Sequence, residues 1–228
     1  MFLLFDIDGT LIVSDNAGRR ALELALWETF QVREVPDVPF SGRTDQFIFR
    51  ELLRVAGLPS SDDHYELLRE SYLGHLPTAL RSGNGQVLPG VVSLLQALSE
   101  DPACHLGLLT GNLPESARMK LGHFELLQYF DFGVYGDHSH DRCDLASEAV
   151  AILRGLHGEH LPEQVWIIGD TDLDVACGKH IRARTLACCT GTQSADELQA
   201  AGADFVLASL HDTPLVLELL RSAPGGQS

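Results

Sequence analysis

Short apolar runs alternate with helical patterns along most of the chain. Each run spans three to five residues and is followed by a segment whose apolar residues recur every three or four positions. Near-continuous apolar strands are typical of a parallel sheet covered on both faces, and their alternation with helices indicates an α/β fold. The predicted strands are residues 2–5, 106–109, 132–135, 165–168, 184–188 and 205–207. The predicted helices are residues 91–99, 115–122, 144–154, 172–180, 195–201 and 213–221.

Residues 15–85 interrupt this alternation, because they contain helical patterns with apolar residues at i+4 spacing and no convincing strand. Turn-forming residues flank the segment at 14–16 and 82–86, where hinges are expected. The pattern therefore predicts a doubly wound parallel sheet in a core domain, residues 1–14 and 86–228, with a small helical domain inserted after the first strand. The helices predicted in the insert are residues 17–31, 44–56 and 62–76.

The composition is that of an ordinary globular protein, since 45% of the 228 residues are hydrophobic and 21% are charged. Sixteen basic against 32 acidic residues give a formal net charge of −16, so neither nucleic acid nor an anionic membrane is expected as a partner. The apolar stretch 2–5 ends at Asp6, too early for a secretory signal. The five cysteines form no CxxC pair, which argues against a zinc ribbon or a disulfide framework and favours the cytoplasm. Nothing in the pattern bears on oligomeric state.

Polar residues follow four of the predicted strands. Asp6 and Asp8 follow the first, residues 110–112 (Thr-Gly-Asn) the second, Arg142 lies in the loop after the third, and residues 169–174 with three aspartates follow the fourth. In parallel α/β sheets, ligands bind outside the carboxyl ends of the strands. The fold should therefore gather these groups at one edge of the sheet.

Three of these acids, Asp6, Asp8 and Asp170, require a cation if the fold brings them together. Two carboxylates about 4 Å apart repel by roughly 4 kcal/mol at an effective dielectric constant near 20. Oxygen ligands select a hard metal, and a few carboxylates with the other positions left to water and phosphate fit Mg²⁺. The sequence therefore predicts Mg²⁺ as a cofactor.

In order and spacing, the stretches DIDGTL, LLTGN and GDTDLD, together with a basic residue in the third loop, resemble the four motifs of haloacid dehalogenase-like hydrolases. The helical insert is similar to that family's small helical cap, and the chain looks most like the phosphoglycolate phosphatase-like group. By this resemblance, Asp6 is the nucleophile that forms an aspartyl-phosphate. Asp8 protonates the leaving alkoxide and then deprotonates the attacking water, and its backbone carbonyl is a metal ligand.

The same resemblance assigns the remaining site residues. Asp170 ligates Mg²⁺, and Asp174 orients the metal's ligands from behind. Thr110, Gly111 and neighbouring backbone N–H groups hold phosphoryl oxygens, with Asn112 close by.

Arg142 departs from the family pattern, which usually has a lysine in the third motif. No lysine lies between Lys120 and Lys179, so Arg142 is the nearby cation that precedes the next helix. A guanidinium can bridge the Asp6 carboxylate and a phosphate oxygen. Arg142 is therefore expected to fill the lysine's role.

Two further groups have alternative interpretations. Arg43, in GRTD between two helices of the insert, either belongs to a capped loop or reaches over the site to the substrate. Arg19 and Arg20 could do the same, although a solvated helix face is favoured for both. His138 and His140 in GDHSHDR could bind a transition metal, but solvated loop histidines are favoured.

The function expected from the motifs is Mg²⁺-dependent hydrolysis of a small phosphorylated metabolite, of the phosphoglycolate or sugar-phosphate type. Asp8 favours phosphate esters, because members of the family that cleave carbon–halogen or carbon–phosphorus bonds lack this acid. One alternative is a sugar phosphomutase of the same family. The other is a non-catalytic metal-binding interaction protein, against which the complete set of acids argues.

Overall fold

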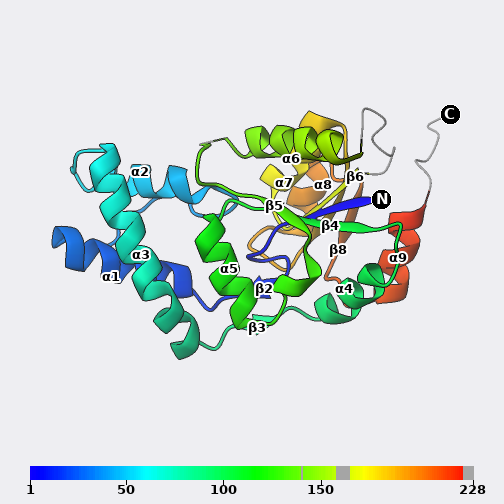
Figure 1. Ribbon diagram of the computed structural model, residues 1–228, viewed down its shortest axis with the longest axis horizontal. Coiled ribbons are helices and arrows are strands. Elements are labelled where there is room, and N and C mark those ends of the chain that lie inside the picture. Colours follow the sequence, from blue (N-terminus) through cyan, green and yellow to red (C-terminus); the bar gives the residue numbers. More distant parts are fainter. Residues whose placement is uncertain (140, 158–164, 223–228) are drawn as a thin grey trace.

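The computed structural model describes residues 1–139, 141–157 and 165–222. Its main sheet contains the strands β1 Phe2–Phe5, β4 His105–Leu109, β5 Phe132–Val134, β6 Val165–Gly169, β7 Arg184–Cys188 and β8 Phe205–Leu207. All six are parallel and lie in the order β5-β4-β1-β6-β7-β8 (Figure 1). The register places Phe5 of β1 beside Leu108 and Ile168, so the three central strands end at nearly the same level.

Helices cover both faces of this sheet. They are α4 Val91–Ser99, α5 Pro114–His123, α6 Arg142–His157, α7 Asp172–Ile181, α8 Ala195–Ala201 and α9 Thr213–Arg221, with a short 3₁₀ helix, η1 Leu127–Tyr129. Leu3 and Phe5 pack with apolar residues of α4, α5 and α9, whereas Leu4 faces the opposite side and packs with α6 and α7. This two-sided cover confirms the predicted α/β fold with a doubly wound parallel sheet.

Three helices between β1 and β4 form a separate bundle, seen at the left of Figure 1: α1 Ala17–Phe30, α2 Asp45–Val55 and α3 Asp62–Ser82. Their apolar faces meet in their own cluster, which includes Phe49 and Tyr72 and takes in Leu113 from the sheet domain. Thr44 and Ser61 begin α2 and α3 by accepting a hydrogen bond from the backbone N–H three residues later. We call these three helices and their connecting loops the helical insert.

Helix α3 is longer than the pattern predicts, because it continues past Pro77 to Ser82 instead of ending at residue 76. Proline inside a helix removes one backbone hydrogen bond. Ala79 and Leu80 lie beyond it and are buried in the cluster of the helical insert. Their burial favours the extra turn despite the proline.

A short antiparallel pair, β2 Ile12–Val13 and β3 Gln86–Val87, joins the helical insert to the sheet domain and was not predicted. Strands of two residues are too short to show an alternating pattern. The carboxylate of Asp15 accepts from the backbone N–H of Asn84 at 2.9 Å, which ties the two junctions together. The junctions therefore lie side by side where the sequence places the hinges.

Among the helices described, none combines the length and the apolar character that are required to cross a membrane.

Candidate active site

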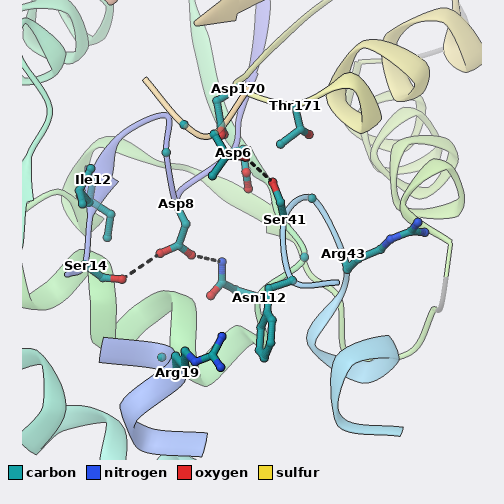
Figure 2. Close-up of a pocket in the computed structure, with 18 of the residues that line it drawn as sticks. Asp6, Asp8, Ile12, Ser14, Arg19, Ser41, Arg43, Asn112, Asp170 and Thr171 are labelled. Carbon is teal, nitrogen blue, oxygen red and sulfur yellow. Dashed lines mark hydrogen bonds between the residues drawn. The ribbon is translucent and has the colours of Figure 1, made fainter. Parts of the chain in front are cut away.

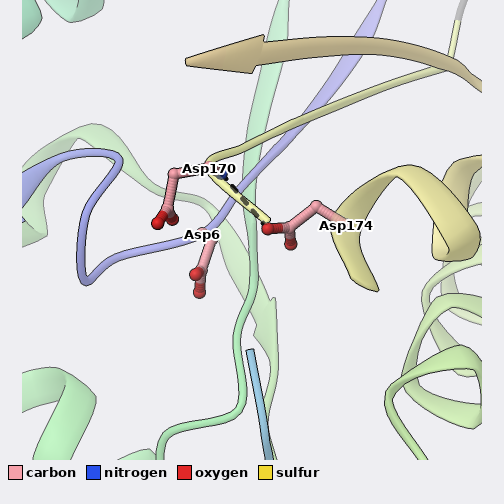
Figure 3. A group of neighbouring side chains, drawn as sticks. All are labelled: Asp6, Asp170 and Asp174. Carbon is pink, nitrogen blue, oxygen red and sulfur yellow. Dashed lines mark hydrogen bonds between the residues drawn. The ribbon is translucent and has the colours of Figure 1, made fainter. Parts of the chain in front are cut away.

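The acids that follow β1 and β6 meet at the carboxyl edge of the sheet. Asp6 directly follows β1, and its backbone N–H donates to the carbonyl of Ile168 at 2.9 Å, which extends the β1–β6 pairing by one residue. Asp170 directly follows β6, and Asp174 lies in the first turn of α7. One carboxylate oxygen from each of Asp6, Asp170 and Asp174 lies within 4.8 Å of the others (Figure 3). We call these three residues the acid cluster.

Two glycines allow the chain to approach Asp170 closely. A Cβ at Gly9, whose φ is +84°, or at Gly191 would overlap with the Asp170 carboxylate. The third neighbour is Thr10, whose hydroxyl donates to Asp170 Oδ1 at 3.0 Å. The loops after β1 and β7 thus enclose this acid and fix its direction.

Arg142 is the cation of the acid cluster. It is the first residue of α6, whereas the sequence placed it in the loop before that helix. Its Nη2 lies 3.0 Å from Asp6 Oδ1 and 2.5 Å from Asp174 Oδ1, and the side chain is only 4% exposed. Burial alone lowers the pKa of Arg142, but the carboxylates of Asp174 and Asp6 outweigh it and raise the pKa above its ordinary value. Arg142 is therefore a permanent positive charge against the predicted nucleophile.

Asp174 is held more tightly than the other two acids. Its Oδ2 accepts from the backbone N–H of Thr171 at 3.0 Å, from the Thr171 hydroxyl at 2.7 Å and from the backbone N–H of Asp170 at 3.2 Å. The first of these bonds and the reciprocal bond from the backbone N–H of Asp174 to Thr171 Oγ1 at 3.3 Å form a capping box at the start of α7. The other acid of this segment, Asp172, is exposed and bonded to Gln193, so it stands outside the acid cluster.

One guanidinium does not neutralise three carboxylates. Burial raises the pKa of Asp6 to about 6, with Asp174 and Asp8 adding to the rise and Arg142 opposing it. Burial and the neighbouring charges of Asp174 and Asp6 raise the pKa of Asp170 to about 8. Closely spaced carboxylate oxygens with raised pKa values fit a divalent cation that prefers oxygen ligands.

Asp8 lies two residues from Asp6 in a different electrostatic environment (Figure 2). Its Oδ2 accepts from Lys120 Nζ at 2.5 Å and from Asn112 Nδ2 at 2.9 Å, and its Oδ1 accepts from the Ser14 hydroxyl at 3.4 Å. Burial raises the pKa of Asp8, but the charge and hydrogen bond of Lys120, with those from Asn112 and Ser14, hold it below its ordinary value.

Lys120 is a site residue that the sequence-based prediction missed. It lies on α5, where it shares the buried face with Ser116, Ala117 and Leu121. Lysine is rarely found on the buried face of a helix. The position of Lys120 on that face could therefore have identified it from the sequence. For a cation that pairs with the acids, the prediction considered only the loop after the third predicted strand, whereas α5 follows the second.

The three residues predicted in the loop after β4 differ from one another in their position relative to the main pocket. Thr110 is fully buried, and its Oγ1 accepts from Asn112 Nδ2 at 2.9 Å. Gly111 and Asn112 line the main pocket, and Thr110 supports them from behind. A Cβ at Gly111 would overlap with the backbone carbonyl of Arg43, so this glycine permits the helical insert to lie close to the site.

The main pocket lies between the sheet edge and the helical insert and has a volume of about 490 Å³. Arg19 of α1 also lines this pocket (Figure 2), and its guanidinium lies over the ring of Phe40, 5.6 Å from the ring centre. Arg43 also borders the pocket, but its guanidinium stacks on Phe47 at 5.2 Å and points away from Asp6 and Asp8 (Figure 2).

His138 lies outside the group of side chains that could hold a metal ion in the described part of the chain. Its ring nitrogens contact the carboxylates of Asp137 at 2.8 Å and Glu148 at 2.7 Å. The acid cluster is the one group found there in which three such side chains come close enough to hold a metal ion. His140 lies outside the described residues.

Residues 3–188 match the family model for haloacid dehalogenase-like hydrolases. The chain belongs to this family.

The chain is 28% identical over 185 residues to a phosphoglycolate phosphatase of Aquifex aeolicus (strain VF5), and the match covers 80% of this chain and 82% of that protein. A predicted phosphoglycolate phosphatase from Haemophilus somnus 129PT superposes with a TM-score of 0.73 at 16% identity, covering 95% of this chain and 97% of that one. A candidate β-phosphoglucomutase from Thermotoga maritima has a TM-score of 0.63 at 19% identity, covering 96% and 98%.

These matches confirm the family and the hydrolase assignment that the motifs predicted. In this haloacid dehalogenase-like hydrolase, the structure brings Asp6, Asp170, Asp174 and Arg142 into contact range. It sets Asp8 beside Lys120 instead, and turns Arg43 away from the acids.

The raised pKa values predict how Mg²⁺ and pH affect stability. Folding raises the pKa of Asp6 and Asp170 above the usual 3.8, so the folded protein binds more protons than the unfolded chain between about pH 4 and pH 8. The free energy of unfolding of the metal-free protein therefore falls as the pH rises through this window. We expect the Tm in chelator to fall between pH 6 and pH 8. A cation binds the deprotonated carboxylates, so Mg²⁺ should raise the Tm more at pH 8 than at pH 6.

The measurement is a thermal-shift series with Mg²⁺ or chelator at each pH. At a hundredfold excess over its Kd, Mg²⁺ should stabilise by about 2.7 kcal/mol, which corresponds to roughly 5–10 °C for a chain of this size. Asp170→Asn should remove the Mg²⁺ effect. An equal Tm with and without Mg²⁺ at pH 8 would contradict the assignment of the acid cluster to a metal.

Proposed function

We propose that this protein is a Mg²⁺-dependent phosphatase that hydrolyses a small phosphomonoester through an aspartyl-phosphate on Asp6. The observation that carries the proposal is the contact of Arg142 with Asp6 inside the acid cluster, with Asp8 two residues along the chain. Family membership and the similarity to a phosphoglycolate phosphatase support the same reaction.

Asp6 is the nucleophile in this mechanism. Arg142 engages Asp6 Oδ1 at 3.0 Å, which leaves Oδ2 outside that ion pair to attack phosphorus. Asp6, Asp170 and the backbone carbonyl of Asp8 would hold the metal, with Asp174 behind them. When bound, Mg²⁺ supplies positive charge that screens the anionic nucleophile from the anionic substrate.

Asp8 moves the proton. It protonates the leaving oxygen as the ester bond breaks, and then takes a proton from the water that hydrolyses the aspartyl-phosphate. Lys120 lowers the pKa of Asp8, so Asp8 is ionised in the free protein. The proton for the first step then enters with the substrate, because a phosphomonoester has a second pKa of about 6. Gly111 and Asn112 would bind phosphoryl oxygens, with Thr110 supporting Asn112.

Residues 15–85 would act as a cap over a core domain formed by residues 1–14 and 86–228. The separate apolar cluster of the helical insert and the position of the pocket beneath it support this division. A pocket of about 490 Å³ suits a small phosphorylated metabolite. We retain the cytoplasm as the expected location.

Asp6→Asn should reduce kcat by roughly four orders of magnitude or more, because the amide is a poor nucleophile at phosphorus. The measurement is release of inorganic phosphate from 2-phosphoglycolate with Mg²⁺. Circular dichroism and the Tm should show that the variant is folded. Turnover near the wild-type rate in Asp6→Asn would refute the covalent mechanism.

A sugar phosphomutase is the second candidate, because one structure of similar fold comes from a candidate β-phosphoglucomutase. Incubation with a hexose 1-phosphate separates the two. Free phosphate supports the phosphatase, and hexose 6-phosphate supports the mutase. Neither product, with no phosphate released from any small phosphomonoester, would support the non-catalytic alternative.

Arg19 and Arg43 of the helical insert are the two candidates for contact with the leaving group of the substrate. The Nε of Arg19 donates to Glu23 at 3.3 Å, and its Nη1 and Nη2 have no hydrogen-bond partner within the described chain, so they can bind an anion in the pocket. Hydrogen bonds to charged groups contribute about 1.5–3 kcal/mol. Arg19→Ala should therefore lower kcat/KM for 2-phosphoglycolate about 10- to 100-fold, and leave ethyl phosphate, which lacks the carboxylate, nearly unchanged.

Arg43→Ala is the matched comparison, since Arg43 is the residue that the sequence predicted for this contact. Its guanidinium points away from Asp6 and Asp8 (Figure 2), so we expect a smaller loss for 2-phosphoglycolate than in Arg19→Ala. A larger loss in Arg43→Ala would assign the contact to Arg43 and remove it from Arg19.

A further inference from the structure

Lys120 forms a closed triangle with Asp8 and Asn112 beside the pocket. Its Nζ donates to Asp8 Oδ2 at 2.5 Å and to Asn112 Oδ1 at 2.6 Å. Asn112 Nδ2 then donates to the same Asp8 Oδ2 at 2.9 Å. Each member of the triangle therefore contacts the other two, and all three residues line the main pocket.

The two carboxylate oxygens of Asp8 differ in their hydrogen-bond partners. Oδ2 receives two donors, one of them charged, whereas Oδ1 receives only the Ser14 hydroxyl at 3.4 Å (Figure 2). The Lys120 side chain is 6% exposed, and the Asp8 side chain is 38% exposed toward the pocket that it lines. One oxygen is thus anchored by a buried cation, and the other is left with a weak partner.

Burial makes this anchor stiff. An ammonium that loses its water must keep its protein partners, because an unpaired buried charge is costly. Charge-assisted hydrogen bonds are also shorter and stronger than neutral ones. Rotation of the Asp8 carboxylate would break both bonds at Oδ2 and leave Lys120 with Asn112 alone.

We propose that Lys120 is a positioning residue for proton transfer: it holds the Asp8 carboxylate so that Oδ1 is the oxygen that exchanges a proton with the substrate. This role rests on the phosphatase function proposed above. In the first step Asp6 Oδ2 bonds to phosphorus and the bond from phosphorus to the leaving oxygen breaks. The electron pair of the broken bond stays on the leaving oxygen, and the proton on Asp8 Oδ1 moves to it. In the second step water bonds to phosphorus, the bond from Asp6 to phosphorus breaks, and Oδ1 receives the proton from the water.

The proposal predicts a dependence on the leaving group. The alkoxide of ethyl phosphate is a poor leaving group that needs the proton, whereas the p-nitrophenolate of p-nitrophenyl phosphate leaves without it. The quantity to compare is kcat/KM, because it covers the steps up to departure of the leaving group. Acid catalysis contributes about 10²- to 10⁴-fold, and loss of the anchor should remove part of that factor.

Lys120→Met should lower kcat/KM for ethyl phosphate about 10- to 100-fold and that for p-nitrophenyl phosphate less than about threefold. The ratio of the two values is independent of the folded fraction, so a poorly folded preparation does not obscure it. Lys120→Arg, which keeps a cation, should restore part of the ratio. Lys179→Met is the matched control, because Lys179 is the only other lysine of the chain and is an exposed residue of α7. It should leave the ratio at the wild-type value.

The Tm rise with Mg²⁺ provides a second readout, and Lys120→Met should keep it. An unchanged ratio in an active Lys120→Met enzyme would overturn the positioning role and leave the proposed function intact. Loss of the Mg²⁺ effect would place Lys120 in support of the metal site and also overturn it. A wild-type protein that hydrolyses neither ester would overturn the proposed function first, and this role with it.

Discussion

The contact of buried carboxylates with Arg142 is the constraint on which the site depends. Asp6, Asp170 and Asp174 come within 4.8 Å of one another because the parallel strands β1 and β6 end side by side. Their mutual repulsion is opposed by one guanidinium, which contacts Asp6 and Asp174. The remaining negative charge would suit a cation at the sheet edge, and without a cation the repulsion lowers the stability of the folded protein.

Two aspartates of one short loop acquire opposite properties from their surroundings. Asp6 faces other carboxylates and burial, so its pKa rises to about 6. Asp8 faces Lys120, Asn112 and Ser14, so its pKa falls below its ordinary value. Separate roles for two carboxyl groups require separate environments. Here the carboxylates after β6 and on α7 surround Asp6, and Lys120 of α5 faces Asp8.

Prediction of the structure from the sequence succeeded where the residue types within a single segment decide its structure. The run at residues 2–5 could only be a buried strand, and the acid after it had to lie at the sheet edge. It failed where distant segments decide. The β2–β3 pair needs residues more than 70 positions apart.

The sequence by itself determined the order along the chain of the helices and of the strands of the main sheet, the family, and the polar groups that follow four of those strands. These features follow from local periodicity and motif spacing. The pairing of Arg142 with Asp6 was expected from the motifs, whereas only the tertiary structure decided that Lys120 faces Asp8. Lys120 and Arg142 lie on different helices and reach Asp8 and Asp6 respectively. Charge pairing acts through space over a few ångströms, and the linear spacing of residues on separate helices does not encode those distances.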